Sequence, residues 1–237
     1  MSSENQKIFT KDNLDLYLNE LAKEYRKRNR HAPPAEIILI GGAAILANYG
    51  FREMTTDVDA IIQAASSMKD AINYVGDKYG LPNSWLNSDF TKTSSYSPKL
   101  KEISVYYKKF SHILEVRTIE SKYLIAMKLR SGRKYKNDLS DIIGILAEHE
   151  KRNKPILLSD INDAVNKLYG GWDGFPKDSK KFIEDTIQNG NYEQIYTSTN
   201  EIEKNTRNIL IEFEQDYPNV VNGLNVDDIL KQITKSE

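Results

Sequence analysis

The stretch that most limits what this chain can fold into is residues 37–62, IILIGGAAILANYGFREMTTDVDAII. It opens on a continuous apolar run, which is typical of a strand buried on both faces. Two glycines follow, and the apolar residues after them predict a short helix at 43–49. A second strand is expected at 58–62, with two aspartates, Asp57 and Asp59, at its start. The order strand, Gly-Gly, helix, strand predicts a fold built around a sheet.

The two aspartates are spaced as the ligands of a shared cation would be. Side chains two residues apart on a strand point to the same face, about 6.6 Å apart at roughly 3.3 Å per residue. Two neighbouring anions repel each other unless a cation neutralises them. The chain has no cysteine and only 3 histidines, so carboxylates are the available ligands. We therefore expect Asp57 and Asp59 to bind Mg²⁺ or Mn²⁺, which prefer oxygen ligands.

Gly41 and Gly42 have a role that complements the aspartates. A strand that passes through Gly-Gly into a helix exposes backbone N–H groups that no Cβ obstructs, at the positive end of the helix dipole. Such donors suit the phosphates of a nucleotide. A phosphate cradle beside a pair of carboxylates is what metal-assisted phosphoryl transfer requires.

The remaining elements are predicted from apolar periodicity and turn residues. A helix is expected at 11–28, a strand at 36–40, a helix at 66–79 and an irregular segment at 81–97. An antiparallel pair follows at 102–108 and 112–118, with its turn at 109–111. Further helices are expected near 121–131, 137–150, 159–169, 178–189, 200–215 and 226–235. We divide the chain into an α/β core with an N-terminal helix, 1–118, and a helical region that completes the cleft, 119–237.

Residues Gly41 to Asp59 resemble the signature of polymerase β-type nucleotidyltransferases, in which a strand ending in Gly-Gly or Gly-Ser leads to Asp-x-Asp on the next strand. More narrowly, the pattern GG(A)x(L)xxxGxRxTxDxD is similar to the AbiEii and DUF6036 group of bacterial nucleotidyltransferases. In that group an arginine and a threonine, here Arg52 and Thr55 or Thr56, stand just ahead of the aspartates. The resemblance implies an α+β fold: a polymerase β-like core, with a mixed sheet flanked by helices, followed by a helical C-terminal half.

A second block, residues 122–146 (KYLIAMKLRSGRKYKNDLSDIIGIL), is similar to the same group's K-L-x-(A/S)-G-R…D-x-x-D-I block. Lys128 is a charge within an apolar run, and such a cation usually has an anionic partner. The resemblance implies that Lys128 contacts substrate phosphate, with help from Arg133. It also implies that Asp138 or Asp141 completes the acidic site.

Other interpretations of these residues stay open at this point. Lys128 could extend past the core and keep its ammonium in water. Asp138 could cap a helix, and Asp141 could be a solvated acid of the first helical turn. Glu115 is a rival third metal ligand, because in the wider superfamily the third acid often lies on a later antiparallel strand. On an edge strand it could equally face solvent.

These residues support a metal-dependent enzyme that moves a nucleotidyl group from an NTP to an acceptor hydroxyl. Asp57, Asp59, Asp138 and Lys128 are the predicted catalytic residues, and the metal ligands are expected among Asp57, Asp59, Glu115 and Asp141. Nucleotide binding is assigned to Gly41, Gly42, Arg52, Thr56, Lys128 and Arg133. Resemblance to AbiEii-like toxins implies a tRNA acceptor and a cognate antitoxin protein. The alternatives are a small-molecule, antibiotic-type nucleotidyltransferase and a catalytically silent nucleotide-binding regulator.

The charge balance limits how a nucleic acid could be held. The formal net charge is −1, so any such partner must be bound by local patches. One candidate patch is the loop at 130–136; another is a basic cluster of Lys23, Arg26, Lys27, Arg28 and Arg30, which could also be a solvated helix end. The start of the chain, MSSENQKIF, lacks the apolar core of a signal peptide, and no apolar run approaches the roughly 20 residues of a membrane helix. We expect a cytoplasmic protein without a membrane partner.

Overall fold

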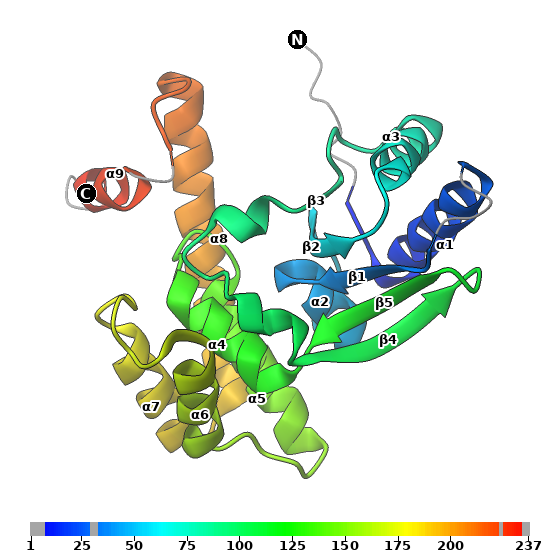
Figure 1. Cartoon of the computed structure of the whole chain (residues 1–237). Helices are drawn as coiled ribbons and strands as arrows, with labels where there is room; N and C mark the ends of the chain where they lie inside the picture. Colours follow the sequence, from blue (N-terminus) through cyan, green and yellow to red (C-terminus); the bar gives the residue numbers. More distant parts are fainter. Residues whose placement is uncertain (1–7, 29–32, 223–224, 234–237) are drawn as a thin grey trace.

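A five-stranded mixed sheet lies at the centre of the N-terminal half (Figure 1). The computed structural model describes residues 8–28, 33–222 and 225–233. The strand order is β3-β2-β1-β5-β4. The strands are β1 (Ala35–Leu39), β2 (Val58–Gln63), β3 (Leu86–Asn87), β4 (Ser104–Phe110) and β5 (Leu114–Ile119). The mixed sheet with helices around it confirms the predicted α+β class.

β1 is the central strand, which explains its uninterrupted apolar sequence. It pairs antiparallel with β2 and parallel with β5, so both of its edges are hydrogen-bonded. Ile37, Ile38 and Leu39 are all fully buried. The strand leads directly into α2 (Gly41–Asn48), whose alanines and isoleucine are buried as well. The start of α2 therefore lies at the carboxyl end of the central strand.

Helices flank the sheet and then make up the second half of the chain. α1 (Lys11–Arg28) and α3 (Ser67–Tyr79) pack against each other on one side (Figure 1). The later helices are α4 (Ser121–Ser131), α5 (Asp138–Lys151), α6 (Leu158–Tyr169), α7 (Ser179–Asn189), α8 (Tyr192–Asp216) and α9 (Val226–Ile233). α4 packs between α5 and α6, and α8 runs along α5. One cluster of buried side chains extends from Phe9 to Ile183, so the sheet and the helices α4 to α7 share a core. None of the described helices is long and apolar enough to cross a membrane.

Three details differ from the sequence prediction. The segment 81–97, expected to be irregular, contributes the short strand β3 and a 3₁₀ turn, η1 (Asp89–Lys92); a second, η2 (Pro98–Lys101), follows. β4 continues through Phe110, and the chain reverses at Ser111 and His112, both in the left-handed conformation. The predicted turn at 109–111 was therefore placed too early. The predicted helix residues 234–235 lie outside the described residues.

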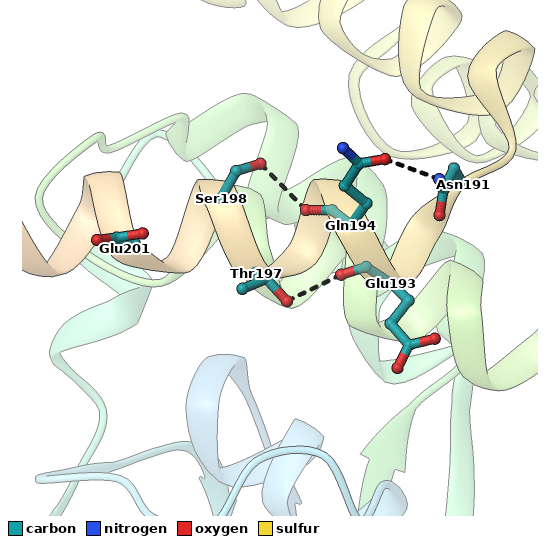
Figure 2. A pocket seen from close by; sticks show the side chains of 6 residues that line it. All are labelled: Asn191, Glu193, Gln194, Thr197, Ser198 and Glu201. Carbon is teal, nitrogen blue, oxygen red and sulfur yellow. Dashed lines mark hydrogen bonds between the residues drawn. The ribbon is translucent and has the colours of Figure 1, made fainter.

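The third difference is that α8 begins at Tyr192 rather than near residue 200. Its first turns contain hydroxyl residues, which are only moderate helix formers. The Thr197 hydroxyl donates to the Glu193 carbonyl at 3.0 Å and the Ser198 hydroxyl to the Gln194 carbonyl at 3.2 Å, as Figure 2 shows. These hydroxyls therefore bond within the helix and do not offer its backbone a non-helical turn instead.

Gly144, in the middle of α5, lets the Phe51 ring pack against the helix so closely that an alanine side chain would not fit. A Cβ at this position would come within 2.5 Å of the Phe51 ring, which also packs against Tyr49 and Tyr196. Within a helix, alanine is more stable than glycine by about 1 kcal/mol. Forcing an extra methyl group into a well-packed core, however, typically costs about 1–3 kcal/mol of stability. We therefore expect Gly144→Ala to lower the free energy of unfolding, measured in urea, by up to about 2 kcal/mol. Gly50→Ala is the control, because a Cβ there meets nothing within 4 Å; equal stability of the two variants would contradict the prediction.

Candidate active site

Asp59 and the Gly-Gly turn lie side by side. Asp59 belongs to β2, and its carbonyl accepts a hydrogen bond from the Ile40 N–H at 2.9 Å. A Cβ built on Gly41 would stand 4.0 Å from an Asp59 carboxylate oxygen. Gly41 has a φ of 55°, a left-handed conformation that favours glycine. The end of β1, the start of α2 and the first acid of β2 therefore meet at one point.

Asp57 lies just ahead of β2 and is exposed, whereas Asp59 is half-buried. Burial raises the pKa of Asp59, and repulsion from Asp57 raises it further. Asp57 therefore acts electrostatically on Asp59 from just outside the strand.

The threonine of this site is Thr55. Its hydroxyl lies 3.2 Å from the Asp57 carbonyl and 3.4 Å from an Asp57 carboxylate oxygen, with the backbone fixed by paired hydrogen bonds to Phe9. Thr56, the predicted nucleotide ligand, is an exposed neighbour.

Gly42 is required for a different reason than Gly41. A Cβ at Gly42 would come within 2.7 Å of the Thr55 hydroxyl and 2.8 Å of an Arg52 guanidinium nitrogen. The absence of a side chain therefore lets Arg52 and Thr55 pack directly against the start of α2. This contact ties the loop before β2 to the Gly-Gly turn.

A chain of buried ion pairs, here called the charge network, links Arg52, Asp141, Lys128, Asp138 and Arg133. Arg52 contacts Asp141 at 2.5 Å, and the same Asp141 oxygen lies 2.9 Å from the Lys128 ammonium. Lys128 also contacts Asp138 at 2.7 Å, and the Arg133 Nε contacts the other Asp138 oxygen at 2.9 Å. Asp138 is 0% exposed, Asp141 2% and Lys128 8%. Charges this deeply buried persist only when they are paired.

The network decides the open questions about Lys128, Asp138 and Asp141. Lys128 is buried rather than extended into water, and its anionic partners are two carboxylates of the protein itself. Burial alone would raise the pKa of Asp138, but Lys128 and Arg133 outweigh it and hold that pKa below its ordinary range. The position of helix cap belongs to Asn137, one residue before Asp138. Asp138 and Asp141 are therefore both paired with lysine and arginine side chains of the protein, and neither is a free acid beside Asp59.

Arg133 connects the charge network to the aspartates of β2. Asp138 and, more weakly, Asp59 hold the pKa of Arg133 above its ordinary value, although burial opposes this. Arg133 in turn lowers the pKa of Asp59, partly offsetting the effect of burial and Asp57. The Arg133 side chain is 44% exposed. It is thus a cation that interacts with Asp59 and remains open to solvent.

Glu115 lies away from this point. It is paired with Glu36 in the register of β5 and β1, whereas Asp59 lies opposite Ile40, four residues further on. That separation is about 13 Å at roughly 3.3 Å per residue. The Glu115 carboxylate instead accepts a hydrogen bond from Arg117 at 2.9 Å.

Asp89 is an acid near Asp59 that the sequence did not single out. It begins η1, two residues after Asn87, whose partner in the β2–β3 register is Asp59. Asp89 also contributes to the raised pKa of Asp59. In the sequence, the polar run Asn87-Ser88-Asp89 follows Trp85 and Leu86, which are buried. This run points to the site only once it is known that Leu86 and Asn87 form a strand paired with β2. Among the described residues, no three His, Asp or Glu side chains are grouped closely enough to hold a metal on their own.

A shallow hollow of about 490 Å³ lies elsewhere, on the exposed side of the first half of α8 (Figure 2). Its lining residues are Asn191, Glu193, Gln194, Thr197, Ser198 and Glu201. It contains two acids and no basic residue, so it does not suit a nucleotide phosphate. None of the residues of the charge network or of β2 lines it.

The mixed sheet with flanking helices is consistent with a nucleotidyltransferase fold, and the glycine turn and the aspartates lie within it. Residues 16–149 match the model of the family DUF6036, described as a nucleotidyltransferase of unknown function. The match covers more than half of the chain, which therefore belongs to this family. It includes the Gly-Gly turn, both aspartates and the whole charge network, and it ends within α5. No curated protein and no solved structure matches the chain.

The charge network leads to a prediction about stability. Asp138→Asn removes the anion that Lys128 and Arg133 share, although Lys128 keeps its contact with Asp141, and losing a hydrogen bond to a charged group costs about 1.5–3 kcal/mol. We expect a loss of that order in the free energy of unfolding at neutral pH, measured by urea unfolding. Because the pKa of Asp138 is lowered, its contribution is present above the ordinary value of 3.8 and is lost as the pH falls below it. The difference between wild type and variant should therefore narrow in acid.

The matched control is Asp89→Asn, which removes an exposed ion pair with Lys92. Pairs of that kind contribute about 0–1 kcal/mol. If both variants lose the same stability, the charge network is not what holds this part of the fold.

Proposed function

We propose that the protein is a metal-dependent nucleotidyltransferase that moves a nucleotidyl group from an NTP to an acceptor hydroxyl. Membership of a nucleotidyltransferase family supports this class of reaction. The observation that carries the proposal is the meeting of the Gly41 turn with Asp59, because it joins backbone phosphate donors to a pair of metal-binding acids. The proposal includes a polymerase β-like arrangement of the sheet.

Asp57 and Asp59 fit Mg²⁺ or Mn²⁺. They are hard oxygen ligands, and the pKa of Asp59 is raised first by burial and then by repulsion from Asp57, a repulsion that a bound cation would offset. Mg²⁺ is commonly held by one or two carboxylates together with substrate phosphates and water, so two acids are sufficient. When bound, the ion supplies Lewis-acid stabilisation of phosphoryl oxygens. We propose Asp89, rather than Glu115, Asp138 or Asp141, as the additional acid of this site.

The chain's own groups would hold the nucleotide. The N-cap residue of α2, Ile40, makes no side-chain cap, so the first N–H groups of the helix are available to phosphate oxygens. Arg133, half exposed beside Asp59, would neutralise charge on the triphosphate. Lys128 and Arg52 would act indirectly, because each is bound to a carboxylate of the charge network.

In the proposed reaction the acceptor oxygen forms a bond to the α-phosphorus while the bond to the leaving pyrophosphate breaks. The proton of the acceptor hydroxyl must pass to a base. Asp89 is the carboxylate we propose for that role, because it is exposed and lies close enough to Asp59 to affect its pKa.

The distribution of basic residues favours a nucleic acid as the acceptor. In the helix α1, Lys23 pairs with Glu20, and Lys27 and Arg28 pair with Glu24. Arg30 lies outside the described residues. The α1 cations are thus largely neutralised, and α1 ends near the start of β1, away from Asp59.

In contrast to the α1 cations, several lysines near Arg133 make no ion pair with any described residue. Five of the exposed lysines that make no ion pair in the described part of the chain follow Arg133 or lie in the segment packed against Gly132: Lys134, Lys136, Lys177, Lys180 and Lys181. They lie in two adjoining segments, because a Cβ on Gly132 would come within 2.8 Å of Pro176, and the Ser179 hydroxyl donates to the Leu129 carbonyl at 2.9 Å. Unpaired cations beside a phosphoryl-transfer site suit a polyanionic acceptor. By resemblance to AbiEii-like toxins, we propose tRNA as that acceptor and an antitoxin protein as a partner.

Replacing Asp59 tests the chemistry. Asp59→Ala should abolish transfer of radiolabel from each NTP to total tRNA in Mg²⁺ or Mn²⁺, because it removes the acid beside the Gly41 turn and leaves the ion only the exposed Asp57. Its melting temperature in metal-free buffer should not fall, since the change relieves repulsion from Asp57. Glu115→Gln is the control, about 13 Å along the sheet by strand geometry, and should transfer normally. Undiminished transfer by Asp59→Ala would exclude the mechanism, whereas a wild type inactive on every RNA would point to a small-molecule acceptor or to a silent regulator.

The acceptor assignment has its own test. The double variant Lys134→Glu, Lys177→Glu should bind tRNA about tenfold or more weakly at low salt, with a shallower dependence of affinity on salt, because phosphate contacts are lost. Its KM for NTP should be unchanged. The matched control is Lys69→Glu, Lys99→Glu, which alters exposed lysines of α3 and η2. Equal weakening by both double variants would show a general charge effect rather than a binding surface.

A further inference from the structure

Helix α8 lies beyond the residues that match the family, yet it inserts an acid beside the charge network. Glu203 is 1% exposed. One of its carboxylate oxygens accepts a hydrogen bond from the Leu139 N–H at 2.8 Å. The other accepts from the Ser140 N–H at 3.3 Å and from the Ser140 hydroxyl. Both N–H groups belong to the first turn of α5.

Glu203 replaces the missing local cap of α5. The first N–H groups of a helix have no partner within the helix, and a side chain at the N-cap usually satisfies one of them. Asn137 occupies the N-cap but makes no such bond. Its side-chain oxygen instead accepts a hydrogen bond from Arg207 of α8, which also donates to the Tyr135 carbonyl at 3.3 Å. Two side chains of α8 thus hold the segment 135–140.

That segment carries the acids of the charge network. Asp138 and Asp141 lie in the same helical turn that Glu203 caps, and through Asp138 they orient Arg133. We propose that Glu203 and Arg207 are positioning residues of the nucleotidyl-transfer site, acting on bound nucleotide through Asp138 and Arg133. The inference rests on the proposed function, because Arg133 is assigned there to the triphosphate.

Glu203 does more than pack α8 against α5. An apolar side chain of similar size would avoid the desolvation cost of a carboxylate, but it would leave the Leu139 and Ser140 N–H groups without this acceptor. That cost is visible here, because burial raises the pKa of Glu203 to about 7 in spite of its three donors. Beyond packing, the carboxylate fixes the orientation of the first turn of α5, because it accepts hydrogen bonds from two N–H groups and one hydroxyl there. The positions of Asp138 and Asp141 follow from that geometry.

The test compares Glu203→Ala with Glu201→Ala in the full chain. Glu201 lies two residues away on α8 and is exposed, so it is a matched control. Below the melting temperature of both variants, Glu203→Ala should weaken binding of each NTP with Mg²⁺, measured by calorimetry, by on the order of tenfold. The loss in kcat/KM should come mainly from KM, and hydrogen exchange in residues 133–141 should become faster. Glu203→Gln, which keeps the size and one acceptor, should restore most of the affinity.

If Glu203→Ala does not fold, Arg207→Ala provides the same comparison, because it releases Asn137 without removing the buried acid. A lower melting temperature with NTP affinity and exchange equal to those of Glu201→Ala would show that α8 is only a brace and would overturn the inference. A wild-type protein that binds no NTP would instead overturn the proposed function. The two failures are therefore distinguishable.

Discussion

The salt bridges of Lys128 with Asp138 and Asp141 are the interaction on which the rest of the site depends. Lys128 comes from α4 and the two acids from α5, and each acid also holds an arginine from a neighbouring loop. Removing Lys128 would leave two buried carboxylates that retain only an arginine each, and weakening a buried ion pair is strongly destabilising. The network therefore sets the relative positions of α4, α5 and the loop that precedes β2.

The same network gives the site its electrostatic character. It contains three cations and two anions, so its excess positive charge lies next to the excess negative charge of Asp57 and Asp59. Arg133 is the member that faces both sets. A nucleotide triphosphate with a divalent cation is complementary to such a pair of surfaces: the cation beside the aspartates, the phosphates toward Arg133 and the start of α2. This complementarity is why the proposed function places the triphosphate between them.

The helices after residue 149 extend this organisation beyond the segment that matches the family. α7 begins against the end of α4, where Ser179 donates to the Leu129 carbonyl. α8 contributes the acid and the arginine that hold the start of α5. The helical half is thus more than an appended domain, because it supports the loop from which Arg133 projects.

Much of this could be predicted from the sequence, because the relevant signals are local. An apolar run ending in Gly-Gly, two aspartates two residues apart and apolar residues at helical spacing each depend on neighbours within a few positions, and β1, α2, β2 and most helices followed them. A lone lysine in an apolar helix predicted an anionic partner in the same way. The identity of that anion could not be predicted from the sequence. The links of Arg52 to Asp141, of Asn87 to Asp59 and of Glu203 to Leu139 join residues far apart in the chain. Local patterns carry no information about such contacts, so the tertiary structure decided that Lys128 is bound by the protein's own acids, that Asn87 pairs with Asp59, and that α8 caps α5.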